Sequence, residues 1–263
     1  MKIGDLKVGD RLLFGTYSVN EEFKGVPVAW LKANNSGVFL AERVIDILRF
    51  DAPEPDNPIY ECRYGGNSDF CKSNIKQFLN SYDDDWYVQS HEFDEPPKID
   101  TGRQSTFGGY LQRPGFLNGF EDYELDCIAG EISLPSTADI FGAPGTPRLQ
   151  LFNRKGLRGR PTNDLIFGKR CHELTERSFC DFWLQSAHGI NLTGFIGRSG
   201  YIETAHPSTP HGVRPKLSII NDIEVEPMPS GDGYRIVPFE AATKRARKGV
   251  VTDEEILELM GLL

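Results

Sequence analysis

The fold is decided by Ser178-Phe179-Cys180-Asp181-Phe182-Trp183-Leu184-Gln185-Ser186, followed further along the chain by Gly212-Val213-Arg214-Pro215-Lys216-Leu217-Ser218-Ile219. The first segment is a short run of large aromatic and aliphatic side chains, which is typical of a buried strand. The second segment turns at its Gly-Val-Arg-Pro sequence and continues as an apolar strand. Together they predict a β-rich core, and neither segment is typical of a catalytic motif.

The composition favours a protein built from many short elements. The chain has 263 residues, enough for one large domain or for a domain with an appendage. Apolar residues make up 39% of it, so a packed core is expected. The 27 glycines and 17 prolines favour turns and short strands over a helical bundle.

Charge and cysteine content argue against several classes of function. The net charge of −9 argues against a nucleic-acid surface, which needs a basic face. No apolar run is long enough for a membrane span or an export signal, so no membrane partner is expected. The five cysteines are an odd number, which favours reduced thiols in a protein made in the cytoplasm.

Local patterns in the first half of the chain predict individual elements. Two apolar arms around an Asn/Ser/Gly turn predict a hairpin over residues 28–41. Ser68 is expected to cap a helix that runs to about Asn80. Residues 91–125 have no sustained period and are expected to form a long loop.

In the second half, residues 131–136 predict a short strand, after which Ser136 or Thr137 could cap a brief helix. A second loop-rich region is expected over 142–170. Short apolar runs then predict the closing strands, at 182–184, 194–196, 200–203 and 213–220.

The character of the chain changes after Ile220, and we expect a domain over residues 1–225 and a tail over 226–263. Prolines and glycines at 227–233 indicate a linker or a last hairpin. A capping box at Thr252 begins an amphipathic helix that is too short to be stable alone, so it must dock. The expected docking residues are Ile256, Leu259, Met260 and Leu263.

Several short motifs, taken in order, resemble the bacterial and phage domain of unknown function numbered 6273, a C-type-lectin-like module. The resemblance runs from about residue 4 to residue 221. The motifs are Val8-Gly9-Asp10, Phe14-Gly15-Thr16-Tyr17, Trp30-Leu31, Asn67-Ser68-Asp69, Ile75-Lys76-Gln77-Phe78-Leu79-Asn80, Ile132-Ser133-Leu134-Pro135-Ser136, Phe182-Trp183-Leu184-Gln185-Ser186 and Gly212-Val213-Arg214-Pro215 with Leu217. The chain departs from the family at 185–187, where Gln-Ser-Ala replaces the usual Arg-Ser-Pro.

The resemblance implies an α+β, C-type-lectin-like domain with a twisted antiparallel sheet, few short helices and long loops. It implies no single activity. Related folds serve as ligand-binding modules, as phage receptor binders and, in one branch, as an oxidising enzyme that uses a cysteine pair. The fold alone does not choose among these functions.

The residues that could carry chemistry are few, and we expect no cofactor and no metal. Cys171 and Cys180 are placed late in the domain, as a cysteine-dependent oxidase would need, but their spacing has no supporting pattern and favours inert thiols. His206 and His211 flank a proline-rich loop that offers only two nitrogens, too few for zinc. The carboxylate and amide motifs of calcium-dependent lectins are absent from the sequence.

Two features could form a recognition surface. Trp86 and Tyr87 follow an acidic run and are expected to be exposed, where aromatic rings suit sugar or protein recognition. A basic cluster that includes Arg154, Arg158 and Arg160 could bind phosphate or an acidic partner. The alternative, which we favour for this cluster, is a loop held by salt bridges to the acidic residues 83–85 or 92–100.

The sequence therefore predicts a non-enzymatic structural or binding module. Because the resembling family is common in phage genomes, we expect a decoration, fibre or tail-associated protein of a virion. Its partners would be other virion proteins or copies of itself, bound through the tail, and a host surface glycan or protein. The alternative function is that of a stand-alone bacterial module that binds carbohydrate or cell surfaces. The alternative location is the cytoplasm. A cysteine-dependent oxidase is a third hypothesis.

Overall fold

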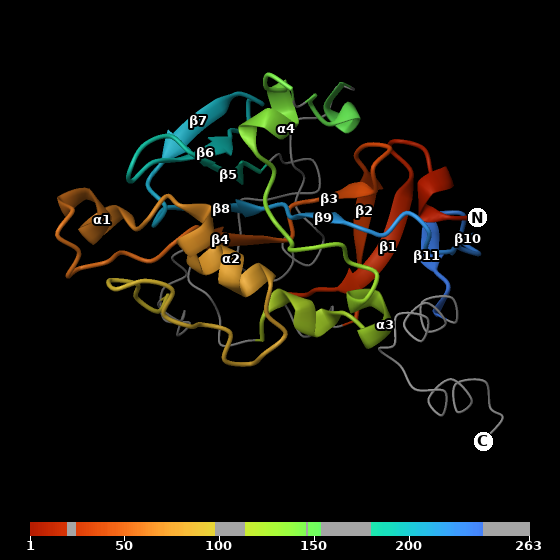
Figure 1. Cartoon of the computed structure of the whole chain (residues 1–263), viewed down its shortest axis with the longest axis horizontal. Helices are drawn as coiled ribbons and strands as arrows, with labels where there is room; N and C mark the ends of the chain where they lie inside the picture. Colours follow the sequence, from red (N-terminus) through yellow and green to blue (C-terminus); the bar gives the residue numbers. More distant parts are fainter. Residues whose placement is uncertain (20–24, 98–113, 146, 154–179, 239–263) are drawn as a thin grey trace.

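The chain folds into a mixed α+β structure, seen here in a computed structural model. The structure describes residues 1–19, 25–97, 114–145, 147–153 and 180–238 (Figure 1). These residues form two mixed sheets, of six and five strands, and four short α-helices. The prediction of an antiparallel sheet is wrong in part, because each sheet also contains one parallel pair of strands.

The six-stranded sheet contains the expected hairpin. Its strands, in order across the sheet, are β10 (Val225–Pro227), β11 (Tyr234–Ile236), β1 (Arg11–Thr16), β2 (Pro27–Lys32), β3 (Val38–Ala41) and β9 (Lys216–Ser218). β2 and β3 pair antiparallel, with Leu31 opposite Leu40. The Asn34 side chain closes the turn between them by accepting hydrogen bonds from the N–H groups of Ser36 and Val38. This confirms the hairpin over 28–41.

The five-stranded sheet contains the closing strands expected at 182–184, 194–196 and 200–203, whereas the strand expected over 213–220 is β9 of the six-stranded sheet. The order of the five-stranded sheet is β4 (Asp46–Arg49), β8 (Pro210–Val213), β5 (Phe182–Ala187), β6 (Thr193–Ile196) and β7 (Ile202–Ala205). β5, the strand of the aromatic stretch, lies between β8 and β6, so it is an interior strand. Its Trp183 is fully buried and donates its indole N–H to the carbonyl of Leu48, 3.0 Å away.

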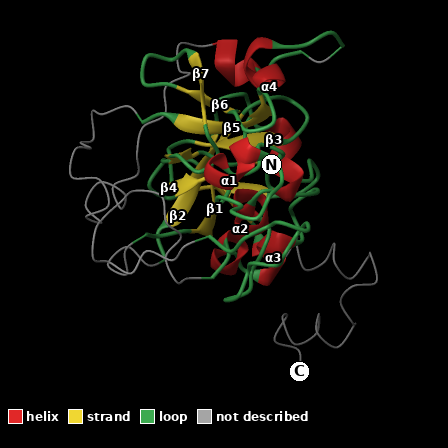
Figure 2. Cartoon of the chain, turned by 90° about the vertical axis from the view of Figure 1, so that its left-hand side faces the viewer, coloured by secondary structure: helices red, strands yellow, loops and turns green. Residues whose placement is uncertain are grey.

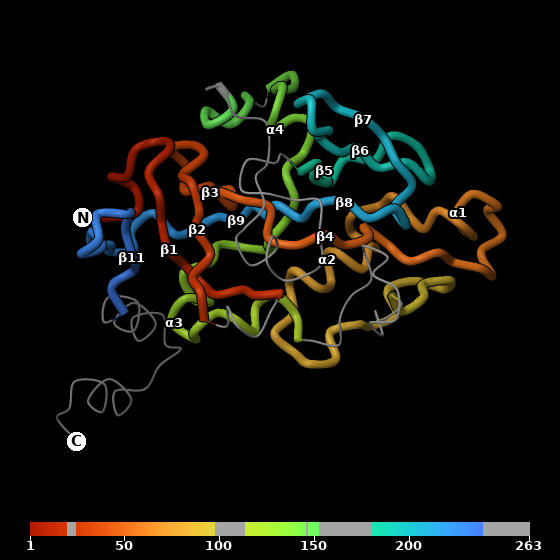
Figure 3. Tube along the Cα trace, turned by 180° about the vertical axis from the view of Figure 1, so that it is seen from behind, coloured from red at the N-terminus to blue at the C-terminus, as the bar shows by residue number. Residues whose placement is uncertain are grey.

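The chain passes between the two sheets twice, and Arg214 joins the two crossings. One crossing runs from β3 to β4 and the other from β8 to β9, and they lie side by side (Figure 3). The Arg214 guanidinium donates to the carbonyls of Ala41 and Glu42 and lies over the ring of Phe182. Burial lowers the pKa of Arg214 to about 10, although the charge of Glu42 opposes the shift. The Gly-Val-Arg-Pro turn therefore has a structural role, because its Arg214 connects the two segments that cross between the sheets.

The α-helices are short, and α2 and α3 lie along one side of the strands (Figure 2). They are α1 (Tyr60–Gly65), α2 (Asn74–Leu79), α3 (Asp122–Leu125) and α4 (Thr137–Phe141). Four 3-10 helices accompany them in the described residues: η1 (Ile3–Asp5), η3 (Phe70–Lys72), η4 (Phe116–Gly119) and η5 (Gln150–Asn153). η4 and α3 lie in the segment expected to be loop over 91–125, and η5 in that over 142–170.

The prediction of one helix capped by Ser68 is wrong. The segment forms η3 and then α2, because two separate residues supply caps. Asp69 accepts from the N–H of Cys71 at the start of η3, and Ser73 accepts from the N–H of Lys76 at the start of α2. By contrast, Ser136 caps α4 as expected, accepting from the N–H of Asp139.

Two further expectations concern strands. The strand expected over 131–136 does not form, since only Ser133 makes a β-bridge, to Lys216. For residues 227–233 the sequence allows a linker or a last hairpin. The structure has the hairpin, in which β10 and β11 pair antiparallel. β11 pairs in parallel with β1, so this hairpin continues the six-stranded sheet past residue 225. The expected docking helix, with Ile256, Leu259, Met260 and Leu263, lies outside the described residues.

Candidate functional site

The candidate site is an open cleft of about 880 Å³. Its walls come from three parts of the chain, within residues 57–71, 131–136 and 185–190. The first part includes α1 and η3, the second leads into α4, and the third is the end of β5 with the loop that follows it. This volume lies in the range of small-molecule sites, roughly 300–1,000 Å³.

The first wall is held in place by buried hydrogen bonds. The N–H of Asn67 donates to the Asp51 carboxylate, at 2.7 Å. The Ser68 hydroxyl lies 2.6 Å from the carbonyl of Gly189 and 2.9 Å from that of Ile190, which connects the first wall to the third. Gly66 makes the turn before them at φ +73, where a Cβ atom would lie 2.7 Å from the carbonyl oxygen of Ala52.

The second wall is fixed to the third by the cap of α4. The N–H of Thr137 donates to the Ser186 hydroxyl of β5, at 2.9 Å. Asp139, which completes the capping box with Ser136, also pairs with Lys216 Nζ at 2.7 Å. All three walls are therefore joined to one another or to the sheets by hydrogen bonds between groups of the protein.

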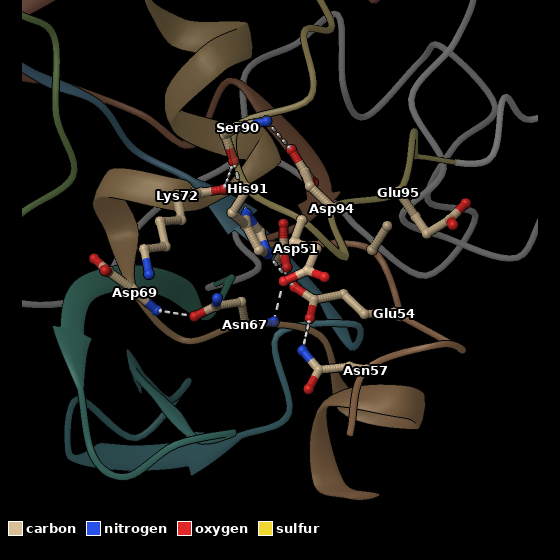
Figure 4. A network of polar contacts seen from close by, with 12 residues as sticks. Asp51, Glu54, Asn57, Asn67, Asp69, Lys72, Ser90, His91, Asp94 and Glu95 are labelled. Carbon is tan, nitrogen blue, oxygen red and sulfur yellow. Dashed lines mark hydrogen bonds and ion pairs between the residues drawn. The ribbon is translucent and has the colours of Figure 1, made fainter. Parts of the chain in front are cut away.

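A network of buried carboxylates holds two of the cleft residues (Figure 4). Asp51, Glu54 and Asp94 are each 5% exposed or less, and they gather in one place. Asp51 accepts from the N–H of Asn67, and Glu54 accepts from the side-chain amide of Asn57. Burial raises the pKa of Asp51 well above its usual range, and the nearby charges of Asp94 and Glu54 add to the shift.

The remaining acceptors of this network are satisfied by protein donors. Nε2 of His91 lies 2.7 Å from Glu54 Oε1, and its Nδ1 lies 2.9 Å from the Ser90 hydroxyl. Asp94 accepts from the backbone N–H of Ser90 and from the side chain of Asn74. Within the described residues, no group of histidine, cysteine and acidic side chains is arranged to hold a metal ion. The network therefore acts as a support for the cleft wall.

The cleft lining itself is mostly neutral and polar. It carries serine hydroxyls and the carboxamides of Asn57, Asn67 and Gln185, with apolar contacts from Ile59, Phe70 and Ile190. Its two carboxylates are Asp69 and Glu131, and its described lining includes no lysine, arginine or histidine. Such a surface can accept and donate hydrogen bonds to a neutral ligand.

Sequence reasoning did not find this cleft, and its aromatic candidates lie elsewhere. The prediction that Trp86 is exposed is wrong: it is 8% exposed and packs edge-on against Phe78, with ring centroids 5.6 Å apart. Tyr87 is half-buried and donates its hydroxyl to the carbonyl of Asp94. Burial and the charges of Asp94, Glu95 and Asp51 raise the pKa of Tyr87 to about 12.

The other predicted residues are separate from the cleft or outside the described chain. His211 stacks on Phe195 and its Nδ1 lies 3.2 Å from Asp181, whereas His206 contacts Asn191. Cys180 is 3% exposed and packs in a hydrophobic cluster with Phe182 and Leu184. Cys171 and the basic residues Arg154, Arg158 and Arg160 lie outside the described residues.

Comparison with known proteins adds no assignment: the chain matches no family model, no curated protein and no solved structure. The class that the fold defines is a mixed α+β protein with two mixed sheets. None of the described helices has both the length and the apolar character needed to cross a membrane.

Proposed function

We propose that this chain is a non-enzymatic binding module whose ligand occupies the cleft. The observation that carries the proposal is the cleft itself, with about 880 Å³ of space and walls already joined by hydrogen bonds. A site whose walls are fixed before binding loses little conformational entropy when a ligand enters. Loops on a rigid scaffold are also where proteins most often place recognition residues.

The two carboxylates of the cleft support binding rather than hydrolysis. An acid that protonates a leaving group is usually kept away from water, in an apolar environment. The Glu131 side chain is 66% exposed and pairs with Lys76 at 3.0 Å. Asp69 accepts from the N–H of Cys71 and caps η3. Both carboxylates therefore lie in polar surroundings and not in the apolar pocket that such an acid requires.

We place the module on a phage virion, as a decoration, fibre or tail-associated protein. The support for this setting is the resemblance to the C-type-lectin-like family over residues 4–221 and the amphipathic pattern at 256–263. In this proposal the tail docks on virion proteins or on copies of the chain, and the cleft faces a host surface. The second candidate is a bacterial module that uses the same cleft on its own, and the mixed polar and apolar lining suits either setting.

Cys71 offers a direct test, because it is exposed and lines the cleft. A maleimide-linked polyethylene glycol attached to Cys71 would fill the cleft without a change of sequence. The labelled protein is expected to lose binding to intact bacterial cells, measured by flow cytometry over a panel of strains. Cys71→Ser protein, treated with the same reagent, is the matched control and keeps binding, since labels on other thiols are present in both.

Equal cell binding by the labelled protein and its control would show that the cleft is not the binding site. Absence of binding to every strain would refute a cell-surface module. For the virion setting, mass spectrometry of particles induced from the strain that encodes the chain is expected to find its peptides. Their absence from purified particles would favour the stand-alone module.

A further inference from the structure

We propose that the ligand of the cleft is a neutral saccharide, bound without calcium. This inference rests on the proposed binding function and names its ligand class. Four observations carry it: the sign of the charges in the lining, the hydrogen-bonding groups left over after folding, the apolar contacts beside them, and the position of β5 inside its sheet.

The charges of the lining disfavour an anionic ligand. Asp69 and Glu131 both contribute carboxylates, and the described lining supplies no positive side chain to offset them. Lys76 pairs with Glu131, but it does not line the cleft. An anionic ligand would therefore lose its hydration and meet charges of the same sign. The charges of the described lining therefore disfavour sialylated, sulfated and phosphorylated ligands.

The polar groups of the lining keep hydrogen-bonding capacity after folding. The Ser186 hydroxyl accepts from Thr137 and still has a proton to donate. The Asn67 side-chain oxygen accepts from the N–H of Asp69, which leaves the amide NH₂ group for a ligand. No described residue hydrogen-bonds the side chain of Gln185, which offers both a donor and an acceptor. Ligand hydroxyls, which donate and accept at once, complement such a mixture.

Apolar side chains provide the second half of saccharide recognition. Ile59 and Ile190 are large exposed aliphatic residues, and both line the cleft together with Phe70. A pyranose ring has polar edges and a less polar face of C–H groups. A lining that combines carboxamides with exposed apolar side chains can contact both.

The position of β5 argues against an extended peptide as the ligand. Peptides commonly bind by pairing with an exposed sheet edge. β5, which supplies Gln185 and Ser186 to the cleft, pairs with β6 on one side and β8 on the other. β8 pairs with β5 only at Phe182, and at the cleft end the N–H of Gln185 donates instead to the carbonyl of Pro135, 2.9 Å away. This backbone donor is therefore not open to a peptide, and we expect recognition in the cleft to rely on side chains.

The proposal is tested on an array that displays neutral, sialylated, sulfated and amine-bearing oligosaccharides, with the full chain as the probe and a calcium chelator present. Gln185→Ala removes a cleft carboxamide while keeping the β5 backbone. Gln150→Ala makes the same chemical change at an exposed position outside the cleft and is the matched control. Circular dichroism checks that both variants fold.

The wild type and Gln150→Ala are expected to bind neutral glycans, and Gln185→Ala roughly fivefold to tenfold more weakly, as the loss of one or two hydrogen bonds implies. Binding only to acidic glycans, binding only with calcium, or equal binding by both variants would overturn the saccharide proposal. So would the absence of binding to every glycan on the array.

These outcomes are distinct from failure of the proposed function. Cell binding that the Cys71 label blocks, with no glycan bound on the array, would refute the saccharide and keep the binding module. If that cell binding also disappears after proteinase treatment of the cells but survives periodate oxidation, the ligand is a protein. Loss of both cell binding and array binding would refute the module itself.

Discussion

Replacement of Asp51 by alanine is expected to lower the free energy of unfolding by about 2–4 kcal/mol. Asp51 accepts hydrogen bonds from the backbone N–H groups of Asn67 and Asn74, at 2.7 and 3.0 Å. Without the carboxylate, these two donors lose their acceptor, and a buried unsatisfied donor costs about 1–3 kcal/mol. Relief of the repulsion from Glu54 and Asp94 offsets part of this loss.

The Asp51 carboxylate also makes the free energy of unfolding depend on pH. Because burial raises its pKa, the direction of this dependence can be predicted. The pKa of Asp51 is raised in the folded state, so the folded chain holds a proton that the unfolded chain releases above about pH 4. The stability contributed by this proton is fully present below that pH and is lost as the pH rises toward the folded pKa. Asp51→Asn, which cannot titrate, is therefore expected to gain stability relative to the wild type as the pH rises.

Urea unfolding followed by tryptophan fluorescence measures both effects, since all three tryptophans are buried. Asp84→Ala removes an exposed carboxylate and is the matched control, expected to change stability by less than about 0.5 kcal/mol. A loss below about 1 kcal/mol in Asp51→Ala, or a difference between wild type and Asp51→Asn that stays constant from pH 4 to 8, would refute the reasoning.

Three further substitutions test separate parts of the fold. Trp86→Ala is expected to destabilise by about 3–5 kcal/mol in urea unfolding, because the ring is buried against Phe78; a change under about 1 kcal/mol would contradict its burial. Ser73→Ala removes the cap of α2 and is expected to cost about 1 kcal/mol by the same assay, whereas no loss would mean that the cap is not formed. Gly119→Ala would place a Cβ atom 1.8 Å from the carbonyl oxygen of Thr16, so its melting temperature is expected to fall by several degrees; an unchanged value would contradict this close approach.

The elements that could be predicted are those whose signal lies in adjacent residues. The turn at Asn34 joins two apolar arms that are next to each other in sequence, so the hairpin follows from local pattern. The cap at Ser136 is likewise a contact over three residues. Local pattern also explains why the start of the helix is predicted at the wrong residue. Ser68, Asp69 and Ser73 all have side chains that can cap a helix. Ser68 is not the cap, because its hydroxyl instead contacts the carbonyls of Gly189 and Ile190, which lie far away in the sequence, and Asp69 and Ser73 supply the caps.

The cleft could not be predicted, because its walls come from segments that are far apart in the sequence. Its residues are ordinary serines, asparagines and glutamines, and none forms a motif with its neighbours. The burial of the carboxylates that support the first wall could not be predicted from the sequence either, because acidic residues are usually exposed. Trp86 shows the opposite error: it follows an acidic run, yet Phe78 of α2 covers it.

The parallel strand pairs show a further limit of local pattern. β1 and β11 lie at opposite ends of the described chain, with Leu12 opposite Tyr234. No spacing rule connects residues that far apart, and β11 is only three residues long. A chain shortened to test the tail must therefore keep residues up to Pro238, so that the six-stranded sheet stays complete.

The central claim is that ligand enters the cleft between η3 and the end of β5, and Cys71 reports on it directly. The measurement is the rate at which iodoacetamide alkylates Cys71, resolved by peptide mass spectrometry, with and without the neutral glycan that binds most strongly on the array. The account predicts that saturating glycan slows alkylation of Cys71 severalfold. An unchanged rate at saturation would show that the glycan binds elsewhere and would contradict the account.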